Sequence, residues 1–247
     1  MPRKMIRFAR FAALLATLTL SSFTFTPLTL ADENDLDAVL QKAYAAWSKV
    51  STWQADFTQT SLYQGTRVRK RGHLIYSQEG KIALHYAPPQ EALAAISGDR
   101  AVAYYPARKA ADQFASPLIE NLPRLLQFGQ PPEMLKLVYD IQWTEPPDPN
   151  CYSLELTPRV PFLFGPQVAK LRMEYDKTTV LPVGSWSFHK DGNWVRFEYR
   201  RAQLNAKVEP SAFEVKLPAG TKVNDAPDLI GVLGELFGFT TPEAKKP

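Results

Sequence analysis

Two hydrophobic periods follow one another in the first third of the chain. Between residues 35 and 50 the apolar side chains recur every three or four positions, which is the spacing of one helix face. Asn34 or Asp35 is available to cap the first turn. The pattern therefore predicts an amphipathic helix, whose apolar positions are Leu36, Val39, Leu40, Tyr44, Trp47 and Val50.

From residue 53 the period changes to two, which is typical of a strand with one apolar face. Trp53, Ala55 and Phe57 alternate with polar residues. The glycines of Gln64-Gly65 and Glu79-Gly80 predict hairpin turns between the strands that follow. The same alternation continues the apolar face through Leu74, Tyr76, Ile82, Leu84 and Tyr86.

The middle of the chain returns to helical spacing, and it is rich in leucine. We expect two short helices here, before and after Pro131-Pro132, inserted into a protein that is otherwise made of strands. The second is marked by Met134, Leu135 and Val138. The first carries Leu118, Ile119, Leu122, Leu125, Leu126 and Phe128 on one face.

The second half is predicted to be an antiparallel meander closed by one further strand. Turns are expected at Asp176-Lys177 and Asp191-Gly192. We place its strands at residues 152–156, 169–175, 185–190, 194–199 and 213–216. Together with the first half, they add Tyr104, Leu171, Met173, Trp186 and Phe188 to the predicted inward face.

The two ends of the chain differ from this central part. Residues 1–10 carry four basic residues and precede an apolar run at residues 11–20, which is the pattern of a secretory signal peptide. The run is about half as long as a membrane-spanning helix requires. We predict cleavage after Ala31, one domain over residues 32–225, and an apolar helix with a polar tail at residues 226–247.

Charge and cysteine content then limit the function classes. The chain has 29 basic and 25 acidic residues, and removal of the four basic signal residues leaves 25 of each. A net charge near zero gives no overall field for a polyanion, so no nucleic-acid partner is expected. Because Cys151 is the sole cysteine and lies far from Ala31, we expect neither an internal disulfide nor a lipid anchor. The secreted chain should be soluble.

The sequence contains no recognisable catalytic or metal-binding motif. His73, His85 and His189 lie in separate predicted strands without ligand spacing, and Cys151 has no second cysteine. The nucleophile elbow, the phosphate-binding glycine loop and the dinucleotide fingerprint are all missing from the sequence. We therefore expect neither an enzyme nor a cofactor, although carboxylates distant in sequence leave a paired site open.

A basic run is the one charged cluster. Arg67, Arg69, Lys70 and Arg71 fall within one predicted strand. They form either a solvated strand face or a local patch for an acidic partner protein or anionic headgroups. The apolar residues have two readings as well. They form an ordinary core, or the inserted helices cover the strands loosely and leave a pocket for acyl chains.

The order of several short motifs resembles the outer-membrane lipoprotein carrier protein family, LolA. In the first half these are Phe57-Thr58-Gln59, Gly72-x-Leu74, Pro88-Pro89, Gly98 and Tyr104-x-Pro106. In the second half they are Leu154-x-Leu156-Thr157-Pro158, Leu181-Pro182, Asp191-Gly192-Asn193 and Phe213-x-x-x-x-Pro218-x-Gly220. The resemblance covers about residues 35–225.

The resemblance implies a mainly β, single-domain fold: an unclosed antiparallel β-barrel, or half-barrel, with an N-terminal helix and a helical lid. It also implies a monomeric periplasmic carrier that takes lipoprotein acyl chains from an inner-membrane exporter to an outer-membrane acceptor. Ile82 stands at a position used against the exporter. The residues expected to bind the acyl chains are Phe57, Leu74, Tyr76, Ile82, Leu84, Tyr86, Tyr104, Leu118, Leu122, Leu125, Leu126, Leu171, Met173, Trp186 and Phe188. Two positions depart from the family pattern. Gln78 stands where an arginine often latches the lid, and Val102 replaces an aromatic residue.

Two other functions stay open. One is a periplasmic carrier of another lipid or glycolipid, which the departures at Gln78 and Val102 allow. The other is a lipid-sensing regulatory module, because the same half-barrel resembles periplasmic sensors that bind anti-sigma factors. Such sensors have a second domain after the half-barrel, whereas few residues follow Gly220 here.

Overall fold

The computed structural model describes residues 35–119, 130–159, 168–227, 232 and 234. Its first element is helix α1, Leu36–Trp47. Asp35 caps this helix, because its side chain accepts a hydrogen bond from the backbone N–H of Asp37 at 3.0 Å. The predicted N-terminal helix is therefore confirmed, and it ends three residues before Val50.

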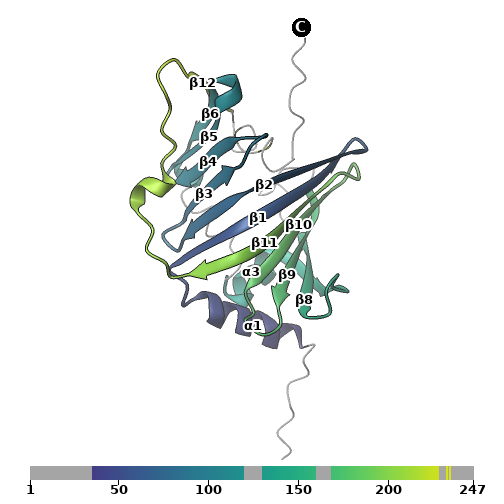
Figure 1. Ribbon diagram of the computed structural model, residues 1–247. Helices are drawn as coiled ribbons and strands as arrows, with labels where there is room; N and C mark the ends of the chain where they lie inside the picture. The colour runs from purple at the N-terminus through teal and green to yellow at the C-terminus, as the bar shows by residue number, and fades with distance from the viewer. Residues whose placement is uncertain (1–34, 120–129, 160–167, 228–231, 233, 235–247) are drawn as a thin grey trace, which may run out of the picture. The chain divides into compact units, whose positions relative to one another are not determined.

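Within these described ranges, twelve strands form one sheet (Figure 1). The strands of the first half are β1 Thr52–Tyr63, β2 Thr66–Ser77, β3 Lys81–Tyr86, β4 Ala92–Ser97, β5 Arg100–Tyr105 and β6 Ala110–Ala115. Those of the second half are β7 Tyr139–Trp143, β8 Cys151–Pro158, β9 Val168–Asp176, β10 Pro182–His189, β11 Trp194–Leu204 and β12 Lys222–Asp225.

The order across the sheet is β12-β6-β5-β4-β3-β2-β1-β11-β10-β9-β8-β7. Every neighbouring pair is antiparallel except β12 and β6, which are parallel. The two halves of the chain join where β1 pairs with β11, in the middle of the sheet. Since β12 and β7 end the order of the described strands without pairing with each other, the sheet is unclosed, as the sequence predicted.

The short helices of the described residues are α3, Pro132–Val138, and the 3₁₀ turns η1 Pro106–Arg108, η2 Pro117–Ile119 and η4 Pro210–Phe213. Helix α3 confirms the second of the two predicted inserted helices. Most of the first, with Leu122, Leu125, Leu126 and Phe128, lies outside the described residues.

The predicted strand at residues 213–216 is wrong. Phe213 ends the turn η4 and is 5% exposed, because it packs on Ile75, Ala83 and Ala95. The alternation of Phe213 and Val215 comes from a segment that lies across β2, β3 and β4, and not from a strand within the sheet.

Candidate functional site

The alternation in β1 defines two faces of the sheet. Trp53, Ala55 and Phe57 point to one face, here called the inner face, and are at most 3% exposed. The opposite, outer face carries Gln54 and Asp56 of the same strand. Pairing carries the inner face across the first half, since Ala55 lies opposite Leu74, Leu74 opposite Leu84, Leu84 opposite Ala94 and Ala94 opposite Ala103.

Four alanines give the inner face of β4 and β5 mainly short side chains. Ala92, Ala94, Ala101 and Ala103, here called the alanine wall, are at most 2% exposed. A methyl side chain shields little of its own strand. The burial of these alanines therefore depends on the larger side chains that pack around them. Among the described residues, the cluster that contains them also includes Ile119 of η2 and Val232.

Aromatic rings line the inner face beside the alanine wall. The Phe57 ring centroid lies 5.0 Å from that of Tyr86 and 5.5 Å from that of Phe197. Gly72 makes this possible, because a Cβ at residue 72 would lie 2.5 Å from a Phe57 ring atom and 2.4 Å from the backbone oxygen of His85. This explains physically why a glycine stands in the middle of β2.

The polar groups of the inner face are mostly uncharged. The Tyr86 hydroxyl donates to Oε1 of Gln59 at 2.7 Å, and Gln59 is 1% exposed. Burial raises the pKa of Tyr86 well above its usual value and raises the pKa of Tyr199 to about 12. The exception is Lys70, whose Nζ lies 5.5 Å from the centre of the Tyr86 ring. Apart from Lys70, this part of the face offers apolar contact and neutral hydrogen-bonding groups.

The other half of the inner face is closed by a helix. Val39, Leu40 and Ala43 of α1 pack on buried residues of β7, β8 and β9, with Leu135 of α3 against them. This cluster is here called the α1-covered core. It holds two of the predicted acyl-binding residues, Leu171 and Met173, so that both contact protein side chains here.

The remaining predicted residues of the first half lie on the inner face, with one exception. Phe57, Leu84 and Tyr86 are buried there, and Leu74, Tyr76 and Ile82 pack beside them. Tyr104 is the exception. Ala101, Ala103 and Tyr105 belong to the inner cluster, so Tyr104, between them in β5, points to the outer face. The prediction was one residue out of phase, and Tyr105 takes the predicted place.

Trp186 and Phe188 are also on the outer face, contrary to prediction. Their neighbours Ser185 and Ser187 lie opposite Met173 and Leu171, which point inward. The two large rings stack on each other with centroids 5.5 Å apart.

Basic side chains cover these two rings. The guanidinium of Arg196 lies 4.8 Å from the Trp186 ring centre, and that of Arg172 lies 5.4 Å from the Phe188 ring centre. Aromatic residues were taken as core residues, whereas here cation–π contacts stabilise them at the surface.

The predicted lid and latch are only partly described. Leu118 belongs to the turn η2, while Leu122, Leu125 and Leu126 lie outside the described residues. Gln78 is exposed in the turn after β2, and its backbone N–H donates to the Ser51 carbonyl at 2.9 Å. Its role as a latch stays a prediction.

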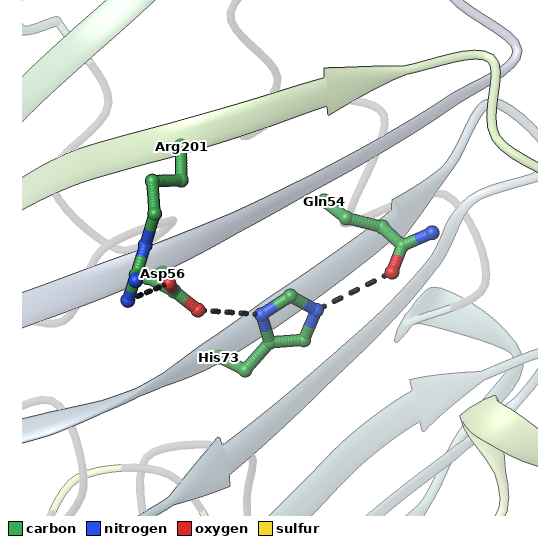
Figure 2. Close-up of polar contacts among 4 residues, drawn as sticks. All are labelled: Gln54, Asp56, His73 and Arg201. Carbon is green, nitrogen blue, oxygen red and sulfur yellow. Dashed lines mark hydrogen bonds and ion pairs between the residues drawn. The ribbon is translucent and has the colours of Figure 1, made fainter.

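The histidines do not form a common site. His189 is buried at the C-terminal end of β10, and burial lowers its pKa. On the outer face His73 Nδ1 lies 3.0 Å from Oδ1 of Asp56, and its Nε2 lies 3.3 Å from Oε1 of Gln54 (Figure 2). The described part of the chain contains no group of three or more metal-ligating side chains. It also contains no helix long and apolar enough to cross a bilayer.

Sequence reasoning did not find the alanine wall, Tyr105 or Phe197 as site residues. Gln59 entered only as part of the motif Phe57-Thr58-Gln59, and Val232 only as part of the apolar helix predicted within residues 226–247. Phe197 could have been found, because it alternates with Val195 in a strand that was predicted. The alanines gave no such signal, since their hydrophobicity is weak and their neighbours in β4 and β5 are also apolar.

An unclosed antiparallel sheet with an apolar inner face and an N-terminal helix is the architecture of a half-barrel binding protein. Residues 48–216, more than half of the chain, match the family described as outer membrane lipoprotein carrier protein LolA. The chain therefore belongs to the LolA family. The family is one of carriers, which agrees with a lipid- or lipoprotein-binding fold. No curated protein sequence matches the chain.

Several solved structures are similar to this one at low sequence identity. An uncharacterized conserved protein from Thermus thermophilus is 9% identical with a TM-score of 0.49, over 76% of this chain and 97% of that one. A LolA superfamily protein from Nitrosomonas europaea is 10% identical with a TM-score of 0.40, over 72% and 96%. The lipoprotein LppX from Mycobacterium tuberculosis is 13% identical with a TM-score of 0.41, over 70% and 97%.

Proposed function

We propose that this protein is a periplasmic carrier that holds lipoprotein acyl chains against the alanine wall and moves them from the inner to the outer membrane. The observation that carries the proposal is the alanine wall itself. Four short side chains are buried on two adjacent strands, between Phe57 and Tyr86 on one side and Tyr105 on the other. Such a surface is apolar and carries mainly short side chains, and it suits an acyl chain that lies along it.

The energetics require a shielded path for this cargo. Burial of a methylene group is worth about 0.8 kcal/mol, so an acyl chain of ordinary length cannot cross water unescorted at a useful rate. A carrier must also release its cargo, and apolar contacts without directional charges allow release more readily than a tight polar site. Family membership supports the delivery route, from an inner-membrane exporter to an outer-membrane acceptor.

Ile82 and Gln78 have specific roles in this proposal. Ile82 is half-buried and packs against the inner cluster. A contact between Ile82 and the exporter would therefore also act on the acyl chains bound there. Gln78 would bond the lid more weakly than an arginine, because a neutral amide lacks the charged fork of a guanidinium. Cargo would then open the lid at little cost.

The direct experiment is a titration of a fluorescent fatty-acyl probe with wild-type protein and two variants. Ala103→Phe places a ring on the inner face, whereas Val102→Phe places the same ring on the outer face of the same strand. The proposal predicts probe binding to the wild type, a loss of about tenfold or more for Ala103→Phe, and little change for Val102→Phe. If the folded wild type binds no probe, the inner face is an ordinary core and the proposal fails.

Native mass spectrometry of protein purified from its own periplasm identifies the cargo. Lipoprotein bound to the wild type supports the shuttle. A glycolipid or another free lipid in its place would favour the second candidate, a carrier of a different lipid.

A further inference from the structure

The outer face of the sheet carries a basic hollow whose charged residues take no part in the acyl-carrier proposal. A depression of about 750 Å³ opens over β1, β2, β3 and β11. We propose that it binds a phosphate-type oxyanion, supplied by a lipid headgroup or by a small soluble phosphate ester. The hollow is lined by Asp56, Phe57, Thr58, Arg69, Arg71, Gly72, His73, His85, Tyr86, Ala87, Arg200 and Arg201.

Strand pairing brings the arginines to the hollow from both sides of β1. Arg71 on β2 lies opposite Thr58, and Arg69 lies opposite Thr60. Arg200 on β11 lies opposite Asp56. The small Thr58 between them leaves space that long arginine side chains can reach over, since neighbouring strands are about 4.8 Å apart.

A β-bulge adds a fourth arginine. Between the pairs Gln54–Gln203 and Asp56–Arg200, β11 has one residue more than β1. Arg201 lies in this bulge with a φ of 53°, a left-handed conformation that a residue with a side chain rarely adopts. The bulge breaks the alternation of β11, so that Arg200 and Arg201, although consecutive, both line the hollow.

The charges of the hollow are unbalanced. Asp56 is the one acidic residue among the described residues that line it, and Arg201 and His73 both pair with it (Figure 2). These two contacts hold the pKa of Asp56 below its usual value. The carboxylate is therefore already paired with His73 and Arg201. Arg69, Arg71 and Arg200 form no ion pair with any residue that the structure describes.

This arrangement fits a phosphate group better than a carboxylate. One guanidinium fork satisfies the two oxygens of a carboxylate, whereas a phosphate group presents oxygens to several forks at once. Three arginines without an acidic partner in the described part of the chain, together with Arg201 beside Asp56, match the second case. The hollow is also larger than a bare phosphate ion needs, which leaves room for the group esterified to it.

The probes for the test are glycerol 3-phosphate, followed by calorimetry, and lipid vesicles, followed by sedimentation. The vesicles contain phosphatidylcholine with or without one-third phosphatidylglycerol, and the salt is kept low because exposed charges are screened. The test variant is Arg71→Gln with Arg200→Gln. The control is Arg159→Gln with Lys190→Gln, which removes the same charge from exposed residues elsewhere.

The proposal predicts that the test variant weakens binding by about tenfold and the control variant by less than about threefold. Binding of glycerol 3-phosphate identifies a site for soluble esters, and binding of phosphatidylglycerol vesicles alone identifies a headgroup site. Both results support an oxyanion site. Fatty-acyl probe binding should be unchanged in the test variant, which separates this site from the inner face.

Two results would overturn the proposal: the wild type binds neither phosphate probe, or the test and control variants weaken binding equally. If both phosphate probes fail while an oligoglutamate peptide binds, the hollow is assigned to an acidic protein partner. Circular dichroism of each variant shows that loss of binding is not loss of folding.

Discussion

The two halves of the inner face are covered by different means. In the α1-covered core, large side chains of β7, β8 and β9 meet a helix that comes from the same domain, as in an ordinary protein core. At the alanine wall the sheet contributes methyl groups, and the described residues outside the strands that pack on this cluster are Ile119, Ala226 and Val232. In the proposed function, the α1-covered core fixes the fold, while the alanine wall is the surface on which cargo would replace the cover.

The largest effect is expected in the α1-covered core. Leu154 is 1% exposed in β8, so Leu154→Ala should lower the free energy of unfolding by about 2–5 kcal/mol. Fatty-acyl probe binding by the folded fraction should stay unchanged. Urea denaturation and the probe titration measure the two quantities. Loss of probe binding at unchanged stability would contradict the division between the halves.

A smaller effect is expected where the alanine wall is covered. Val232 is fully buried among the inner-face residues, so Val232→Asp would place a charge there. The side chain at residue 232 should leave the inner face instead, at a cost of about 1.5–3 kcal/mol of unfolding free energy, which is the burial energy of one such side chain.

Probe binding should become tighter in Val232→Asp, because the acyl chain no longer competes with Val232. The matched control is Val223→Asp on β12, where the side chain is 45% exposed and away from the inner cluster. Weaker probe binding in Val232→Asp alone would show that Val232 forms part of the site and does not compete for it.

The smallest effect concerns pH. Burial lowers the pKa of His189, and also that of His85, below 6.5 in the folded protein, so the unfolded chain binds more protons in mild acid. Stability should therefore be full above pH 6.5 and fall as the pH drops through and below that value. Urea midpoints at pH 7.5 and 5.5 measure this loss. His189→Gln should reduce the difference, and an unchanged difference would show that other groups cause it.

The sequence predicted the elements whose periodicity is clear. Helix α1, the strand phases of Trp53 to Phe57 and of Leu84 to Tyr86, and the meander of β8 to β11 are confirmed, because in each case one face is apolar and the other polar. The strands β4 and β5 carry apolar residues on both faces, and residues 208–215 pack on the outer face of β3 and β4. Alternation then gives no phase, and Tyr104 was assigned to the wrong side.

Trp186 and Phe188 show a second limit. A strand that alternates large aromatic residues with serines normally buries the aromatic residues, so the prediction followed the rule. Here neighbouring strands supply Arg172 and Arg196 over the rings, and the serines point inward. The cationic partners lie at different distances along the sequence and meet the rings only through sheet register, which no local pattern contains.

The measurement that tests the central claim most directly is site-specific photocrosslinking in cells. A photoreactive phenylalanine analogue replaces Tyr105 at the alanine wall, Leu171 in the α1-covered core or Trp186 on the outer face. The account predicts acyl-lipid adducts from Tyr105, few from Leu171 and none above background from Trp186. Adducts from Trp186 at least as abundant as those from Tyr105 would contradict it.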